Sequence, residues 1–168
     1  MELTSDHDSC VILAGLLAHH GVKHVVVSPG SRNAPLAVAV NRQGAFDIKV
    51  IIDERSAAFA ALGMASISGL PTALICTSGT ALLNYAPAVA EAYYRQIPLI
   101  VISADRPQEW IDQDDSQTIR QFRALDNVVK NSYDLPAFTS TDNLRWLVNR
   151  YRYIGQRAKL LYGQRQPF

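Results

Sequence analysis

Four short apolar runs recur along this chain, and each is followed within a few residues by a segment with the composition of a helix. The runs are HVVVS, DIKVIID, TALICT and PLIVIS, at residues 24–28, 47–53, 72–77 and 98–103. Their β-branched content is typical of strands that are buried on both faces. Strands alternating with helices at this spacing predict βαβ units. We therefore expect an α/β fold, with a doubly wound, mainly parallel sheet and helices on both of its faces.

The segments between these runs have the character of helices. The first, at residues 8–20, carries aliphatic side chains on one face and has Gly21 placed as its C-cap. Further helices are predicted at residues 35–41, 54–68, 81–95 and 142–161. A fifth strand is expected near residues 127–133.

Composition narrows the class of protein. The 168 residues are 48% hydrophobic, and 16 basic side chains nearly balance 15 acidic ones, which excludes a disordered chain. The longest apolar run, at residues 10–18, is far shorter than the roughly 18 residues of a membrane span. The start, MELTSDHDS, lacks the basic region of a signal peptide. We expect one domain over residues 1–168, in the cytoplasm and not bound to a membrane.

Neither the cysteines nor the histidines form a metal-binding pattern. Cys10 and Cys76 lie far apart in apolar surroundings, so neither a disulfide nor a metal site is expected. Three of the four histidines cluster near the end of the first predicted helix, where capping is the more ordinary role.

The C-terminal segment is basic. Residues 143–168 contain six basic and no acidic side chains, interleaved with aromatic residues. One interpretation is nucleic-acid binding through arginines and stacking rings. The other is a closing helix within a tail at residues 142–168, whose arginines face solvent near the helix C-terminus. One basic helix on a near-neutral domain is a weak footprint, so no nucleic-acid partner is expected.

Polar loops follow the predicted strands, one at each carboxyl end. They are SPGSRN, DER, TSGT and ADRP, at residues 28–33, 53–55, 77–80 and 104–107. Open α/β sheets bind ligands beyond the carboxyl ends of their strands. The connections at the opposite edge, GVKH and SGLPT among them, are plain turns. A binding site is therefore expected where the polar loops meet.

The common nucleotide and hydrolase motifs are missing from these loops. No G-x-G-x-x-G follows a strand, and there is no Walker A sequence. Ser78 lies in CTSGTA, which lacks the flanking glycines of a nucleophile elbow.

Glu54 has two interpretations. It is a first-turn carboxylate that would complement the helix macrodipole, with Asp53 as the N-cap. It is also a carboxylate at a strand end beside apolar Ala57 and Ala58, where desolvation would tune it for general acid–base work.

Two arginines stand in the loops beside a residue that restricts the backbone. Arg32 follows a Pro-Gly-Ser run, and Arg106 precedes a proline. Each is either a surface ion-pair partner or a bidentate ligand of a substrate carboxylate. Two arginines of the second kind would indicate an anionic substrate, such as a dicarboxylate.

A family resemblance rests on five segments in chain order: SPGSRNAPL, IDERSAAFAALGMA, TSGTALLNYAPAVAEAYY, PLIVISADRP and DSQTIRQ. Together they resemble the N-terminal, pyrimidine-binding (PYR) domain of the thiamine diphosphate enzymes of menaquinone biosynthesis, the 2-succinyl-5-enolpyruvyl-6-hydroxy-3-cyclohexene-1-carboxylate synthases. The resemblance covers residues 8–135. SPGSRN together with ADRP separates this family from other thiamine diphosphate enzymes.

The resemblance implies a transferase or carboligase that uses thiamine diphosphate and Mg2+ to decarboxylate 2-oxoglutarate and add the succinyl unit to isochorismate. Glu54 matches the catalytic glutamate that hydrogen-bonds N1′ of the cofactor's aminopyrimidine ring. Thr77, Ser78 and Gly79 match the stretch that lies against this ring.

The resemblance also implies residues that bind substrate. Ser31 and Arg32 match positions that hold the isochorismate carboxylate, Arg106 a further substrate-binding arginine, and Gln117 a glutamine near the reacting carbon. The chain departs from the family just before Gln117, where residues 114–116 read Asp-Asp-Ser in place of a Gly-Ala-Asn type of run.

The family's cofactor lies between the pyrimidine domain of one subunit and the diphosphate-binding domain of its neighbour, in a homodimer or homotetramer. The chain contains no GDG…N segment of the kind that holds Mg2+ and the diphosphate. We therefore expect half of a site, inactive alone and belonging to a longer enzyme. A stand-alone, non-catalytic module of the same fold and a domain of another thiamine diphosphate carboligase are the alternatives.

Overall fold

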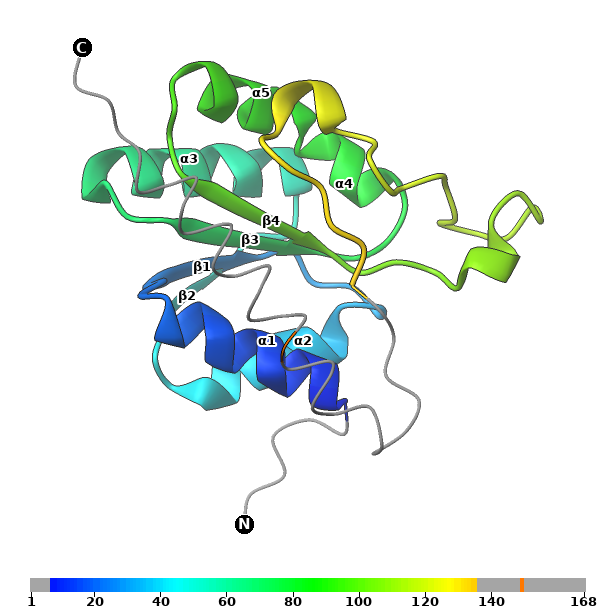
Figure 1. Cartoon of the computed structure of the whole chain (residues 1–168), viewed down its shortest axis with the longest axis horizontal. Coiled ribbons are helices and arrows are strands. Elements are labelled where there is room, and N and C mark those ends of the chain that lie inside the picture. The colour runs from blue at the N-terminus through cyan, green and yellow to red at the C-terminus, as the bar shows by residue number, and fades with distance from the viewer. Residues whose placement is uncertain (1–6, 136–148, 150–168) are drawn as a thin grey trace.

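A four-stranded, all-parallel sheet lies at the centre of the molecule (Figure 1). The computed structural model describes residues 7–135 and residue 149. The strands stand in the order β2-β1-β3-β4. Their bounds are β1 His24–Val27, β2 Asp47–Val50, β3 Thr72–Cys76 and β4 Leu99–Ser103.

Helices cover both faces of this sheet (Figure 1). On one face lie α1 (Asp8–His19) and α2 (Ala34–Gln43). On the other lie α3 (Glu54–Ser68), α4 (Thr80–Asn84) and α5 (Ala86–Tyr94). The predicted doubly wound α/β fold is confirmed. Within the described residues, no helix has the length and apolar character needed to cross a membrane.

The alternation of side chains along β1 divides the core into two layers. Val25 and Val27 pack in the cluster with α1 and α2, whereas Val26 packs in the cluster with α3 and α5. All three are buried, because successive side chains of a strand point to opposite faces and helices cover both faces here (Figure 1). β1 pairs in parallel with both β2 and β3, so its apolar run serves both layers at once.

The predicted helix at residues 81–95 is wrong in one respect, because it is two helices. α4 ends at Asn84, and α5 begins at Ala86 with a proline in its first turn. Pro87 has no backbone N–H, and its ring would clash with the carbonyl four residues earlier in a continuous helix. Tyr85, at the junction, is fully buried.

The fifth strand predicted near residues 127–133 is also wrong. A short 3₁₀ helix, η2, occupies Asp126–Val128, and residues 129–133 contain no strand. The amides of Asp126 and Val128 donate to the carbonyls of Arg123 and Leu125, which removes them from any ladder. Val128 and Val129 still pack against the core with α5, which accounts for their apolar character. The helix predicted at 142–161, and the tail at 142–168, lie outside the described residues.

A buried tyrosine connects the helices to the ends of two strands. The Tyr85 hydroxyl lies 3.0 Å from the Ile75 carbonyl oxygen, to which it donates, and 3.3 Å from Ser28 Oγ. Burial is the main cause that raises the pKa of Tyr85, so the hydroxyl stays protonated at physiological pH. The bond fixes the α4–α5 junction beneath the loops that follow β1 and β3.

We expect Tyr85→Phe to lower the free energy of unfolding by about 0.5–1.5 kcal/mol, since it removes a hydrogen bond and leaves the ring in place. Urea unfolding of the protein at its native length would measure the loss. Tyr94→Phe is the matched control, because Tyr94 is 77% exposed. Equal effects of the two substitutions would contradict the role of the Tyr85 hydroxyl.

Candidate functional site

Two neighbouring strands send their chains to opposite faces of the sheet. After β1 the chain enters α2 on one face, and after β3 it enters α4 on the other. Adjacent β1 and β3 thus define a topological switch point, and open α/β sheets bind ligands in the crevice at such a point. The predicted meeting of polar loops at one sheet edge follows from the parallel register of the strands.

The loop after β1 is closed by a buried asparagine. Asn33 Nδ2 donates to the Ser28 carbonyl oxygen at 2.8 Å, and Asn33 Oδ1 accepts from Gly30 N at 2.8 Å. Its side chain is 1% exposed. Ser31 and Arg32 lie within this closed loop and are exposed. The asparagine of SPGSRN therefore holds the turn, and the two residues before it are the ones free to meet a ligand.

A glycine lets the loops after β1 and β3 touch. A Cβ on Gly30 would lie 2.6 Å from Thr77 Cβ and 2.9 Å from Thr77 Oγ1. Thr77 Oγ1 is buried, and among the described residues it has no hydrogen-bond partner. The two loops thus close over a polar atom that is still able to accept or donate a bond.

The loop after β3 rests on a distant segment. Ser78 Oγ donates to the Gln117 carbonyl oxygen at 3.1 Å. A Cβ on Gly79, whose φ is +79°, would lie 2.8 Å from that same oxygen. Gln117 itself has a φ of +54°, and it is exposed. The backbone of Gln117 is therefore fixed against the loop that carries Ser78 and Gly79.

Gln121 also holds this loop, and no local sequence pattern distinguishes it. Gly79 N donates to Gln121 Oε1 at 2.8 Å, and Gln121 is 4% exposed. The two residues are 42 positions apart, and the one signal in the sequence is that Gln121 ends DSQTIRQ, a segment on which the family resemblance rests.

Glu54 begins α3 at the same edge of the sheet. Asp53 is its N-cap, as predicted: Asp53 Oδ1 accepts from Ser56 N at 2.7 Å, and the bonds from Ser56 lower the pKa of Asp53. Glu54 is half-buried. Burial raises the pKa of Cys76 to about 12, and the negative charge of Glu54 adds to this rise. Glu54 therefore lies close enough to the end of β3 for its charge to act there.

Arg106 lies inside its own loop. Its Nη2 donates to the Ser116 carbonyl oxygen at 2.9 Å, and its Nη1 lies 3.3 Å from Asp115 Oδ2. The guanidinium carbon is 5.3 Å from the centre of the Trp110 ring, and the side chain is only 9% exposed. Arg106 is thus an ion-pair partner in this structure. Its Nε is buried and has no partner among the described residues, so binding of a substrate carboxylate stays open as well.

The predicted site residues therefore fall into two groups. Those at the crevice or directly against its loops are Ser31, Arg32, Glu54, Thr77, Ser78, Gly79 and Gln117. Arg106 stands apart, because its cationic group is already engaged by residues 110–116. The departure from the family pattern at residues 114–116 supplies two of its partners.

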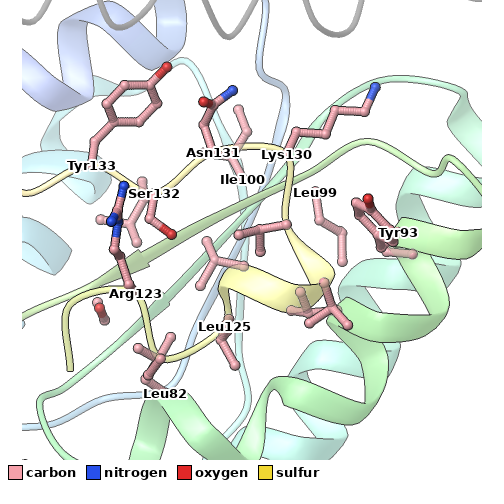
Figure 2. A pocket seen from close by; sticks show the side chains of 18 of the residues that line it. Leu82, Tyr93, Leu99, Ile100, Arg123, Leu125, Lys130, Asn131, Ser132 and Tyr133 are labelled. Atoms are coloured by element: carbon pink, nitrogen blue, oxygen red, sulfur yellow. The ribbon is translucent and has the colours of Figure 1, made fainter. Parts of the chain in front are cut away.

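A cavity of about 520 Å³ lies elsewhere, along the outer edge of β4. Figure 2 shows it between the residues of β4, the face of α5 that carries Tyr93, and the segment from Arg123 to Tyr133. It does not include Glu54, Thr77 or the loop after β1. In the part of the chain that the structure describes, no group of three His, Cys, Asp or Glu side chains is arranged to hold a metal ion.

Comparison with known protein families shows which family this chain belongs to. Residues 11–124 match the thiamine pyrophosphate enzyme family, in its N-terminal TPP binding domain. The chain belongs to this family.

Its relatives within that class share one name. The chain is 53% identical to the 2-succinyl-5-enolpyruvyl-6-hydroxy-3-cyclohexene-1-carboxylate synthase of Porphyromonas gingivalis over 146 residues, 87% of this chain and 25% of that protein. The synthases of Cytophaga hutchinsonii and Desulfotalea psychrophila are 52% and 56% identical, over 86% and 71% of this chain and 26% and 23% of theirs. The resemblance seen in the sequence is confirmed, and the chain spans about a quarter of the length of these relatives.

We expect Gly30→Ala to destabilise the protein by about 1–3 kcal/mol, because the new methyl group would overlap the Thr77 side chain. Urea unfolding of the native-length protein would measure it. Gly15→Ala is the control. Gly15 lies inside α1, where an added Cβ would meet no heavy atom within 4 Å outside its own stretch of helix, so the change should stabilise the protein by roughly 0.5–1 kcal/mol.

A double-mutant cycle tests whether the Gly30–Thr77 contact is the cause. Gly30→Ala combined with Thr77→Gly should lose less stability than the sum of the two single losses, since the second change removes the overlapping Cβ. Strictly additive losses would show that the contact does not limit this position.

Proposed function

We propose that this domain belongs to a thiamine diphosphate-dependent synthase that decarboxylates 2-oxoglutarate and adds the succinyl unit to isochorismate. The observation that carries the proposal is the meeting of polar loops at the β1–β3 switch point, with the half-buried Glu54 at the start of α3 and the loop of Ser78 and Gly79 held against Gln117. The relatives of this chain are synthases whose name describes the product of that reaction.

The residues at the crevice fit the pyrimidine half of the cofactor. An aminopyrimidine that gains a proton at its ring nitrogen needs a carboxyl group there, and the half-buried Glu54 offers one. Gly30 and Gly79 carry no side chain where the backbones meet. Thiamine diphosphate, when bound, supplies the electron sink that decarboxylation of a 2-oxo acid requires.

The proposed roles are those that the family resemblance implies. With the cofactor bound, Glu54 would hydrogen-bond N1′ of the aminopyrimidine ring, and Thr77, Ser78 and Gly79 would lie along the ring. Ser31 and Arg32, exposed in a closed turn, bind a substrate carboxylate. Gln117 would lie near the reacting carbon.

Arg106 is proposed to bind a second substrate carboxylate. Arg106 follows the carboxyl end of β4 in the chain, and its Nε has no partner among the described residues. The two arginines are consistent with substrates that are both dicarboxylates.

The proposal includes a second domain. Mg2+ and the diphosphate are held by a diphosphate-binding domain of a neighbouring subunit, in a homodimer or homotetramer in the cytoplasm. The share of the relatives that this chain spans, about a quarter, supports a larger assembly around the site. The residues described here would then be inactive without that partner.

Glu54→Gln in the native-length protein should lower turnover of 2-oxoglutarate with isochorismate by at least about a hundredfold, because the amide can neither give a proton to the ring nitrogen nor take it back. The melting temperature should stay unchanged. Glu91→Gln, an exposed carboxylate on α5 paired with Arg95, is the control and should keep full activity.

The outcomes of this assay separate three cases. Near-normal turnover by Glu54→Gln would remove Glu54 from its role. Turnover of pyruvate by the wild-type protein, without turnover of 2-oxoglutarate and isochorismate, would favour another thiamine diphosphate carboligase. No thiamine diphosphate-dependent turnover at native length would contradict the proposed function.

The two arginines should respond differently to substitution by alanine. Arg32→Ala should raise the KM for an anionic substrate by roughly ten- to a hundredfold through loss of charge-assisted bonds, with stability unchanged. Arg106→Ala should raise KM and also lower the melting temperature, because Asp115, Ser116 and Trp110 lose their common partner. Arg42→Ala, at the exposed end of α2, is the control. Equal melting temperatures for both variants would contradict this difference.

A further inference from the structure

Gln121 joins the carboxyl ends of two neighbouring strands. Its Oε1 accepts from Gly79 N at 2.8 Å, just after β3. Its Nε2 donates to Ser103 Oγ at 2.9 Å and to the Ala104 carbonyl oxygen at 2.7 Å, at the end of β4. One side-chain amide thus bonds to both of the loops that leave these strands.

These bonds lie in a buried environment. Gln121 is 4% exposed, and Gly79 is buried as well. A buried amide hydrogen without a partner costs about 1–3 kcal/mol, so Gly79 N cannot leave Gln121 without finding another acceptor. Among the described residues, no other acceptor of this hydrogen is found.

The same segment holds the loop a second time. Four residues before Gln121, the Gln117 carbonyl oxygen accepts from Ser78 Oγ and lies 2.8 Å from the position that a Cβ of Gly79 would take. Residues 117–121 therefore contact the loop after β3 at two places, through Gln117 and through Gln121. At one end Gln117 is exposed toward solvent, and at the other Gln121 is buried between the strand ends.

We propose that Gln121 is a positioning residue. It fixes the Thr77–Gly79 loop, which lies along the cofactor ring, relative to Gln117, which faces the substrate. The inference rests on the proposed function, since it gives the two loops those roles. Gln121 is buried with its amide bonded to protein groups, so it would act by holding Gly79 and Gln117 in one fixed relation.

Three substitutions in the native-length protein test this role. Gln121→Glu keeps the size and the acceptor for Gly79 N, but a carboxylate has no hydrogen to donate to Ala104. Gln121→Ala removes all three bonds. Ser103→Ala removes only one acceptor and should have the smallest effect. Gln43→Ala, an exposed glutamine at the end of α2 and at the opposite edge of the sheet, is the matched control.

Two readouts are needed. Hydrogen exchange followed by mass spectrometry reports on the amides of residues 77–80 without any cofactor, and exchange there should rise in Gln121→Ala and less in Gln121→Glu. Thiamine diphosphate binding, followed by titration, should weaken by roughly tenfold or more in Gln121→Ala, in line with the loss of buried hydrogen bonds. The kcat should fall further than the KM for 2-oxoglutarate rises.

A structural role alone would give a different pattern. Variants that melt earlier but keep wild-type exchange at residues 77–80, cofactor affinity and kcat would overturn the inference. If Gln121→Ala does not fold, Gln121→Glu and Ser103→Ala decide on the same readouts. Absence of thiamine diphosphate binding by the wild type would remove the proposed function, whereas faster exchange at residues 77–80 would still show that Gln121 holds the loop.

Discussion

The close approach of the loops after β1 and β3 is the constraint on which the candidate site depends. Parallel pairing places Val27 opposite Ile75, so both chains leave the sheet side by side before they diverge. They meet only because Gly30 carries no Cβ against Thr77. From below, the Tyr85 hydroxyl bonds to Ser28 and Ile75 and fixes both strand ends to the α4–α5 junction. Contacts within the protein thus fix the loops at the switch point without any ligand.

Local signals explain how much of the fold could be predicted. The predicted bounds of α3 are confirmed, because the residues next to its two ends mark them. Asp53 caps its start, and Gly69, at a φ of +67°, ends it. The strand at residues 127–133 was wrong because apolar residues there pack on the core through a 3₁₀ turn. Apolar character predicts burial, but it does not decide which backbone hydrogen bonds achieve it.

The candidate site divides along the same line. The gathering of loops at one sheet edge could be predicted, because parallel strands require it. The partners of Arg106 and the bonds of Gln121 could not. They depend on a long segment in which Asp112, Asp114 and Gln117 adopt positive φ values that few residues other than glycine favour. Contacts with residues far away in the sequence determine the backbone conformation of this segment, and no helical or strand periodicity in the sequence predicts it.

The two arginines that look alike in the sequence stand in different electrostatic states. Arg32 is exposed, so water screens its attraction for an anion and the closed turn must supply the rest. Arg106 is nearly buried and already paired with Asp115 through Nη1. A carboxylate that bound there would compete with Asp115 for Nη1, so the ion pair that it replaces would offset part of its attraction. Its advantage would come from geometry, since a bidentate ligand can also engage the buried Nε that the present contacts leave without a partner in the described chain. Selectivity at Arg106 would therefore depend on shape more than on charge.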